Sequence, residues 1–561
     1  MAALQLILLL LAVGAGLRIA AERLKIPYSA LLVVGGLALA FFPHLPRPDL
    51  SPEVIFIIFT PPLIYRGAAS FPLRDLWHQM GPILHLAVLM VLVSTACVAV
   101  VAHAVDPAFT WAAAFTLGAI VSSPDPVPVE SMMRDLKAPR AVQSLLEGEA
   151  LLNDATALIV YRLAIAAAVT GEFRLWRATG EFVIAAGGAL LIGAAIGAVV
   201  IGMHRLTRTV PVVENAVSLL TPYAAWFPAE SLGASGVVSV ATTGMIVARY
   251  FQNVSSPETR LQNAAIWSMV TFLLESLAFV LVGFALPQVI RTGEMATLLE
   301  EAGIVCVFLV IIRVAWILPS SWVGRRVERW IRGDEEPLPS WRELLFVAWT
   351  GIRGGDAVAI ALALPFTVAS GAPYPARAQI VFITFAVVLA TLVVQGSTLA
   401  PVARLLRLRE DESEEDEEAN ARLVVAEAGL RALESPDSGA TPHPEIVRYL
   451  RLRQMERVRG WAGVEALLRI HDAGGASQDR QVTSPSRDPA LLAQDRAAKY
   501  RTLRGAMLNA EEKALLDLRD RGVIGDEVMR RILRDLDLER ILVDSPEPLS
   551  EAQAGIRAEP E

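Results

Sequence analysis

Charged side chains within otherwise apolar stretches are the residues of this 561-residue chain whose chemistry is most informative. They are Asp125, Glu147, Glu149, Asp154, Glu230, Glu275, Arg313, Arg353 and Asp356. An ionisable group inside a membrane is costly, so it usually faces a partner or an aqueous cavity and marks an ion or proton pathway. Taken singly, each residue is equally compatible with a buried ion pair. Taken together, they predict a pathway for ions or protons.

Three prolines surround one of these carboxylates: Pro124, Pro126 and Pro128 flank Asp125. Each proline lacks an amide donor and disrupts the preceding helical turn. Inside a bilayer the freed carbonyls are tolerated only where protein or a water-filled cavity satisfies them. We therefore expect an interrupted span whose half-helix ends, backbone oxygens and carboxylate form a cation site. A plain structural kink is the alternative.

A second segment, Glu147–Asp154, opens a predicted helix that carries several polar side chains. Glu149 and Asn153 are four residues apart and share a face, whereas Asp154 lies about 100° further round. Such a helix can present Asp154 to a cavity while Glu149 turns toward a neighbouring helix. Arg353 is the expected neighbour, because the glycines beside it allow close helix approach and a guanidinium can bind a carboxylate through two hydrogen bonds.

The elements that position these residues must be transmembrane helices. Hydrophobic residues make up 54% of the chain and charged residues 19%, a balance that argues against an ordinary cytosolic enzyme. Apolar windows centre near residues 11, 37, 60, 94, 120, 157, 192, 221, 241, 276, 310, 354 and 389, which predicts about thirteen spans.

Met1 to Leu17 lacks a cationic leader and is interpreted as a retained first span. Cys97 and Cys306 support neither a disulfide framework nor a thiolate metal site.

Lysine and arginine are concentrated in alternate loops, which predicts the orientation of the chain. The enriched loops include the groups Arg134, Lys137 and Arg140, and Arg325, Arg326, Arg329 and Arg332. Short cytoplasmic loops carry the excess of positive charge, so we expect the N-terminus outside and the C-terminal tail in the cytoplasm. The net charge of -8 reflects an acidic run in that tail, over residues 410–418.

Beyond Arg409 the apolar windows stop and charged residues alternate with leucine and alanine at helical spacing. Two stretches rich in serine, proline and glycine, Ser435–Pro444 and Gly474–Pro489, predict linkers between three or four helices. The last helix, over Asp526–Leu542, carries an apolar face that we expect to pack on a partner helix. That face is Val528, Ile532, Leu536 and either Leu538 or Ile541. A solvated tail that packs only on itself is equally compatible with this pattern.

The chain resembles the monovalent cation/proton antiporter family, which includes the bacterial and animal sodium/proton exchangers. The most specific match is Glu147-Gly-Glu-Ala-Leu-Leu-Asn-Asp154, which is similar to the family signature Glu-Gly-Glu-Ser-Leu-Leu-Asn-Asp. Supporting matches are Asp125-Pro-Val127, Leu220-Thr-Pro-Tyr223 followed by Glu230, Ser235-Gly-Val237, Glu275, Gly351-Ile-Arg-Gly354 and Ala361-Leu-Ala-Leu-Pro365. The resemblance runs from residue 1 to about residue 405, and the tail resembles the helical extension of bacterial members.

The resemblance implies an all-α polytopic membrane protein with interrupted helices and inverted repeats. It places a transmembrane exchange domain over residues 1–405 and a regulatory helical tail over 406–561. It assigns the ion and proton site to Asp154, Asn153 and Asp125, with the transported alkali cation at Asp154 and Asp125 as the only metal. It also implies a buried structural pair of Glu149 with Arg353. Glu275, Asp356 and Arg313 are candidate accessory residues. A homodimer in the plasma (inner) membrane is expected, without cofactor or nucleic acid.

The expected function is exchange of a monovalent alkali cation, foremost Na⁺, for H⁺, with roles in pH and sodium homeostasis. If Asp154 crosses between inward- and outward-open states only when it holds a proton or a cation, exchange needs neither ATP nor enzymatic chemistry. Asn153 in place of a second adjacent carboxylate resembles the electroneutral branch of the family. A K⁺/H⁺ antiporter is the alternative, followed by a cation channel.

Two family hydroxyls are missing from the expected site. Pro124 stands where the family often has threonine, and Ala150 where it has serine. Nearby hydroxyls that can compensate are those of Ser122, Ser123 and Thr156. Cation identity and affinity therefore depend on how this chain replaces the missing ligands.

Asp356 is a further departure, since the family has an apolar residue at this position. It can pair with Arg353 or Arg313, or act as an additional titratable site. The ion pair is the favoured interpretation.

Overall fold

The structure is a computed structural model that describes residues 2–24, 28–42, 52–70, 80–125, 129, 133, 139–170, 175–290, 295–332, 340–368, 370–408, 413–434, 444–461 and 489–544. Within these ranges the chain is helical, and the one extended pairing is an isolated bridge between Thr367 and Pro373. By its internal contacts the chain divides into two compact units. One comprises Met1–Ser255 and Asn263–Asp411, and the other Ser256–Gln262 and Glu412–Glu561.

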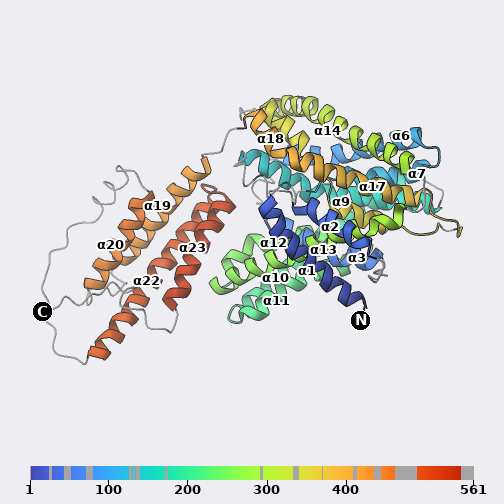
Figure 1. Ribbon diagram of the computed structural model, residues 1–561. Helices are drawn as coiled ribbons and strands as arrows, with labels where there is room; N and C mark the ends of the chain where they lie inside the picture. The colour runs from blue at the N-terminus through green and yellow to red at the C-terminus, as the bar shows by residue number, and fades with distance from the viewer. Residues whose placement is uncertain are drawn as a thin grey trace. The chain divides into compact units, whose positions relative to one another are not determined.

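The helices of the first unit precede Asp411 in the chain (Figure 1). They are α1 (Ala2–Leu24), α2 (Tyr28–Ala40), α3 (Pro52–Ser70), α5 (Met80–Leu84), α6 (Val91–Val105), α7 (Trp111–Ser122), α9 (Arg140–Thr170), α10 (Leu175–Thr207), α11 (Pro211–Ser231), α12 (Gly236–Val254), α13 (Pro257–Ile290), α14 (Met295–Arg332), α15 (Trp341–Trp349), α16 (Gly355–Leu362), α17 (Arg377–Ala390) and α18 (Gly396–Leu406). Two π-helical turns interrupt them, η1 (His85–Met90) and η2 (Thr391–Gln395). The residues of α13 up to Gln262 belong to the second unit.

Six stretches of the described residues are long and apolar enough to cross a membrane. They are Met80–Val105, Val142–Val169, Ile184–Thr207, Pro257–Leu281, Met295–Ser321 and Arg377–Leu406. Each contains one of the predicted span centres, and shorter apolar helices cover the centres near residues 11, 37 and 120. The multi-pass, all-α membrane fold is therefore confirmed. The count of thirteen spans and the inverted repeats stay predictions.

Two predicted spans are broken rather than continuous. α7 ends at Ser122, and Ser123 continues in an extended conformation. The span centred near residue 354 is divided into α15 and α16, with no helix over residues 350–354. The interruption predicted around Asp125 is thus confirmed as far as Asp125 itself; Pro126 and Pro128 lie outside the described residues.

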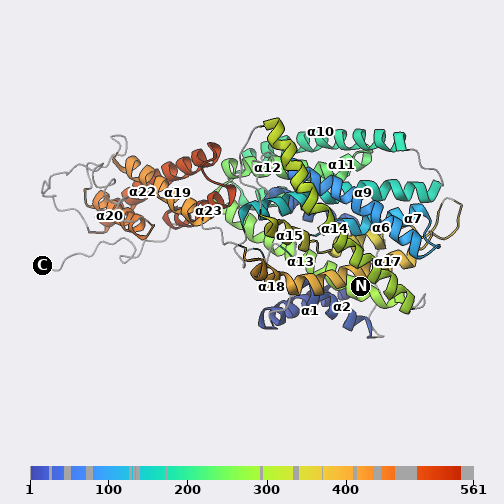
Figure 2. The ribbon, with the colours of Figure 1, turned by 90° about the horizontal axis from the view of Figure 1, so that it is seen from above.

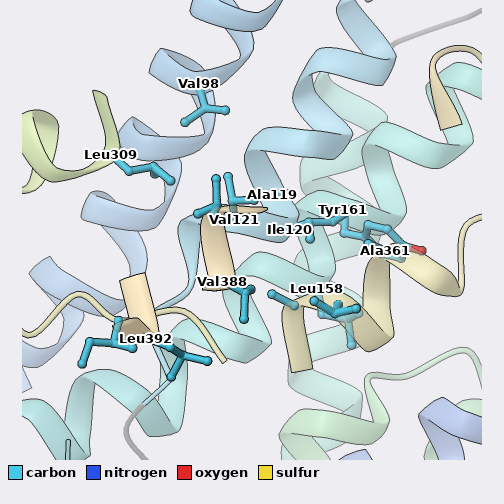
Figure 3. Packing of buried hydrophobic residues seen from close by; sticks show 14 of the residues in the cluster. Val98, Ala119, Ile120, Val121, Leu158, Tyr161, Leu309, Ala361, Val388 and Leu392 are labelled. Carbon is cyan, nitrogen blue, oxygen red and sulfur yellow. The ribbon is translucent and has the colours of Figure 1, made fainter. Parts of the chain in front are cut away.

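One apolar cluster fills the interior of the first unit and brings the broken helices together. α7 contacts α6, α9, α16 and α17, and α15 contacts α9, α14 and α18. Figure 3 shows part of this packing, where Val121 at the end of α7 belongs to the same cluster as Leu158 of α9 and Val388 of α17. α10, α11 and α12 pack on one another (Figure 2), and α12 also packs on α3.

The second unit is a helical bundle with its own core. It contains α19 (Ser413–Glu434), α20 (Pro444–Trp461), α22 (Pro489–Asp520) and α23 (Asp526–Asp544). Helices end or begin at the predicted breaks, whose interiors lie outside the described residues. The predicted apolar face of α23 is buried at Val528, Ile532 and Leu536, whereas Leu538 is 47% exposed. The position offered as an alternative to Leu538, Ile541, is half-buried.

An ion-pair network accompanies the core of this bundle. Arg504 on α22 is buried and bonds both Glu511 on α22, at 3.0 Å, and Glu539 on α23, at 2.8 Å. Arg457 on α20 donates to Glu539 at 2.9 Å, and Gln454 on α20 donates to Glu511 at 2.7 Å. Burial alone raises the pKa of Glu539, but its bonds with Arg504 and the nearby arginine charges outweigh that effect and lower the pKa below its ordinary value. The ionised carboxylate therefore stabilises the bundle.

Replacing this carboxylate should weaken the bundle in a pH-dependent manner. Because the pKa of Glu539 is lower in the folded protein, its contribution is present above the ordinary glutamate pKa and is lost as the pH falls through the folded-state value. We expect Glu539→Gln to lower the free energy of local unfolding of α22 and α23 at neutral pH by about 1–3 kcal/mol. The difference from wild type should shrink in acid. Amide hydrogen exchange of the full-length protein across a pH series measures this directly.

The matched control is Asp517→Asn, which removes an exposed i,i+4 pair between α22 and Arg521, the residue directly after that helix. Exposed pairs of this kind contribute about 0–1 kcal/mol. Equal effects of Glu539→Gln and Asp517→Asn would contradict a stabilising role for the buried network.

Candidate functional site

Two broken helices meet in the first unit, where a backbone hydrogen bond joins them. We call this place, formed by residues 123–125 and 350–354, the crossing. The amide of Asp125, beyond the end of α7, donates to the carbonyl of Ile352, between α15 and α16, at 2.8 Å. Gly354 lies directly against the Asp125 side chain: a Cβ atom placed on it would stand 1.5 Å from Asp125 Oδ2. Only glycine leaves room for this carboxylate, so residues 123–125 and 350–354 form one interlocked segment.

Arg353 satisfies backbone groups that the breaks leave without helical partners. Its Nε donates to the Val121 carbonyl at 2.5 Å, and its Nη1 to the Gly351 carbonyl at 2.8 Å. Its amide donates to the hydroxyl of Thr391, the first residue of η2, at 3.1 Å. The side chain is 2% exposed. Irregular backbone inside a membrane needs such partners, and Arg353 supplies them.

α9 presents Asn153 and Asp154 to the extended segment that follows α7. Ser123 Oγ donates to Asp154 Oδ1 at 2.6 Å, and Asn153 Nδ2 donates to the Pro124 carbonyl at 3.1 Å. Asn153 is fully buried, whereas Asp154 keeps part of its surface accessible. The three residues predicted for the ion site, Asp125, Asn153 and Asp154, are therefore brought together around one crossing.

Of the hydroxyls proposed to compensate for the missing ligands, Ser123 alone bonds Asp154 among the described residues. Ser122 donates to the Ala119 carbonyl at 2.9 Å, and Thr156 to the Leu152 carbonyl at 3.1 Å. Both bonds are local to their own helices. Ser123, which precedes Pro124, thus supplies a hydroxyl to Asp154 next to the position where the family hydroxyl is missing.

The prediction that Glu149 pairs with Arg353 is wrong, because a different arginine binds Glu149. Glu149 is instead bound by Arg313 of α14, with Nη1 to Oε1 at 2.6 Å and Nη2 to Oε2 at 2.8 Å. Arg313 also donates to the Val347 carbonyl on α15, and both side chains of the pair are 2% exposed. Helical spacing placed Glu149 on a neighbour-facing side of α9 but carried no information on which of two buried arginines faces it.

Asp356 also differs from the favoured interpretation. It forms no ion pair with Arg353 or Arg313, both of which the structure describes, and its Oδ1 is buried without a hydrogen-bond partner. The carboxylates of Asp356 and Asp154 interact electrostatically. The alternative interpretation of Asp356, an additional titratable site, stays a prediction.

Two further sequence candidates lie elsewhere. Glu275 of α13 interacts electrostatically with Tyr28 of α2, whose hydroxyl is hydrogen-bonded to Ser276 at 2.5 Å. Glu230 at the end of α11 accepts bonds from Arg162 and from the Gly236 amide, each at 2.9 Å. Thr391, which bonds the Arg353 amide, was not predicted, because nothing in its sequence surroundings distinguishes it from other membrane threonines.

Comparisons with known proteins show which protein family the chain is similar to. The family model for "Sodium/hydrogen exchanger, transmembrane" matches residues 7–405. An uncharacterized Na⁺/H⁺ exchanger of Mycobacterium tuberculosis is 30% identical over 536 residues, covering 94% of this chain and 93% of that protein. The low-affinity Na⁺/H⁺ antiporter NhaS1 of Synechocystis is 33% identical over 436 residues, covering 76% and 78%.

A Bacillus subtilis relative named as a sodium, potassium, lithium and rubidium/H⁺ antiporter is 32% identical over 383 residues, covering 66% of this chain and 56% of that protein. Among solved structures, the sodium proton antiporter MjNhaP1 from Methanocaldococcus jannaschii matches with a TM-score of 0.58 and 19% identity. The match covers 72% of this chain and 98% of that one. It supports the fold described here.

Breaking the buried pair should destabilise the first unit strongly. Arg313→Met leaves the Glu149 carboxylate buried without its cation, which we expect to cost about 3–5 kcal/mol. The double variant Arg313→Met with Glu149→Leu should recover much of this loss, because it removes the uncompensated charge as well. Thermal unfolding of the purified protein in detergent measures both effects.

Arg162→Met provides the matched control, since its pair with Glu230 has side chains 44% and 29% exposed. We expect a change of at most about 1 kcal/mol there. A control as unstable as Arg313→Met, or a double variant no better than the single one, would contradict the assigned pair.

Proposed function

Because the chain belongs to the sodium/hydrogen exchanger family, we propose that it is a secondary transporter that exchanges a monovalent alkali cation for H⁺ across the membrane. The observation that carries this proposal is the placement of Asp154. Its carboxylate stands beside two broken helices, receives a hydrogen bond from Ser123, and keeps part of its surface accessible. Such a group can bind either a proton or a cation.

Competition for the same oxygens couples the two ions. A metal ligand must be deprotonated, so a cation that binds Asp154 displaces its proton, and a proton that binds it displaces the cation. If the site changes its access only when one of them is bound, each turnover moves a cation one way and a proton the other. The gradients supply the driving force, and no covalent bond is made or broken. We propose one-for-one, electroneutral exchange.

Na⁺ is the proposed principal cation. The names of the Mycobacterium and Synechocystis relatives specify Na⁺, which favours this assignment. K⁺ is the second candidate, because the name of the Bacillus relative includes potassium, lithium and rubidium as well. The oxygen donors around Asp154 suit any of these hard cations.

The cellular setting follows from the same proposal. We place the protein in the plasma (inner) membrane as a homodimer, with its N-terminus outside and the helical tail in the cytoplasm. The arginine-rich loops support this orientation. Exchange of this kind serves pH and sodium homeostasis, and the second unit is the proposed regulatory part.

The proposal predicts that Asp154→Asn abolishes exchange. Purified protein is reconstituted into vesicles that hold a pH gradient, and chloride salts of Li⁺, Na⁺ and K⁺ are added in turn. Wild type should dissipate the gradient with saturable dependence on the cation. Asp154→Asn should match protein-free vesicles, because a neutral amide cannot exchange a proton for a cation.

Asp106→Asn is the control for this assay, since Asp106 lies at the α6–α7 turn and bonds Gln379 and the Ala108 amide. It should retain exchange. Undiminished coupled exchange by Asp154→Asn would refute the proposal. Cation flux that does not saturate and moves no protons would support a channel instead.

A further inference from the structure

The buried polar atoms around Asp154 include two that have no hydrogen-bond partner among the described residues. They are Oδ1 of Asn153 and Oδ1 of Asp356. Leaving such an atom buried and unpaired costs free energy, so each needs an explanation within the site. Both atoms are acceptors, and an acceptor without a donor is what a cation site offers.

The orientation of the Asn153 amide is fixed by its neighbour. Its Nδ2 donates to the Pro124 carbonyl at 3.1 Å, and a carbonyl can only accept. Exchanging the two ends of the amide would place one acceptor against another. Oδ1 is therefore the end that faces away from Pro124, and its lone pairs stay unused in a fully buried side chain.

Asp356 reaches the same site from another element. It is the second residue of α16, directly after the segment that interlocks with Asp125. Its carboxylate interacts with the backbone amides of Asp356 and Ala357 and, electrostatically, with Asp154. Its Oδ1 is buried and has no hydrogen-bond partner among the described residues.

The arginines near Asp356 are already engaged. Arg313 holds both oxygens of Glu149, and Arg353 donates to the carbonyls of Val121 and Gly351. Arg353 acts on Asp356 through space, without an ion pair between them among the described contacts. Asp356 is thus a carboxylate whose buried Oδ1 is available to a ligand.

We infer that Asp356 is an additional oxygen ligand of the transported cation, and that, beside Asn153 Oδ1, it compensates for the hydroxyl ligands missing at Pro124 and Ala150. This inference rests on the proposed cation exchange and names a residue that sets its cation affinity and preference. Alkali cations take oxygen ligands from carboxylates and amide carbonyls, and affinity rises with the number of charged ligands. Asp154, Asp356 and Asn153 together supply that set from two elements.

The rival role for Asp356 is structural, because an acidic residue in the first turn of α16 is stabilised by the helix N-terminus. The two roles differ in what they change. A ligand sets the apparent KM for the cation and the ratio of KM values among Li⁺, Na⁺ and K⁺. A residue that only supports α16 lowers the maximal rate of every cation alike.

The test compares wild type, Asp356→Asn, Asp356→Ala and the control Asp106→Asn in the vesicle assay with Li⁺, Na⁺ and K⁺. We expect both Asp356 variants to raise the apparent KM for the preferred cation by at least about 10-fold and to alter the preference among the three ions. Asp356→Asn should keep a measurable maximal rate, because its amide still fits the first turn of α16. Asp106→Asn should match wild type.

The outcomes separate this inference from the function on which it rests. Absence of cation-dependent exchange in wild type would overturn the proposed function itself. Exchange in wild type with unchanged KM values and preference in Asp356→Asn would overturn the ligand role alone. If Asp356→Asn does not transport, the rise in melting temperature that each cation produces in detergent decides: a lost rise supports the ligand role, and a wild-type rise overturns it.

Discussion

The first unit depends on one constraint: two helices that break beside each other must satisfy their exposed backbone groups without help from bulk water. The crossing meets this constraint from within the protein. The Asp125 amide pairs with the Ile352 carbonyl, and Arg353 takes the carbonyls of Val121 and Gly351. These hydrogen bonds satisfy the backbone groups at the breaks. Oδ1 of Asn153 has no hydrogen-bond partner among the described residues and is available to a ligand.

The two buried arginines, Arg313 and Arg353, bind different kinds of partner. Arg313 neutralises Glu149 and bonds the Val347 carbonyl of α15, which ties α9, α14 and α15 together next to the break. Arg353 carries no bound carboxylate among the described contacts and serves the backbone instead. Under the proposed cation exchange, the carboxylates of Asp154 and Asp356, which interact with each other, are the negative charges that a bound cation compensates.

The signals that predict the candidate site are local in the sequence. Proline around Asp125 and glycine around Arg353 predict broken helices, and the order of residues on α9 sets Asp154 apart from Glu149. The partner of Glu149 was missed because Arg313 is 164 residues away and the choice between two arginines depends on how helices pack. The choice between Leu538 and Ile541 on the apolar face of α23 was left open for a similar reason, because it depends on how the helices pack. In the structure Ile541 is half-buried, whereas Leu538 is exposed.

The contact between Gly354 and Asp125 restricts how this chain can diverge. The two positions share one volume, so nearly every substitution that adds a side chain at residue 354 competes with the carboxylate at residue 125. A side chain at residue 354 therefore requires a smaller residue at position 125, whereas Gly354 cannot be made smaller to admit a larger one there. We expect residue 354 to change only together with residue 125.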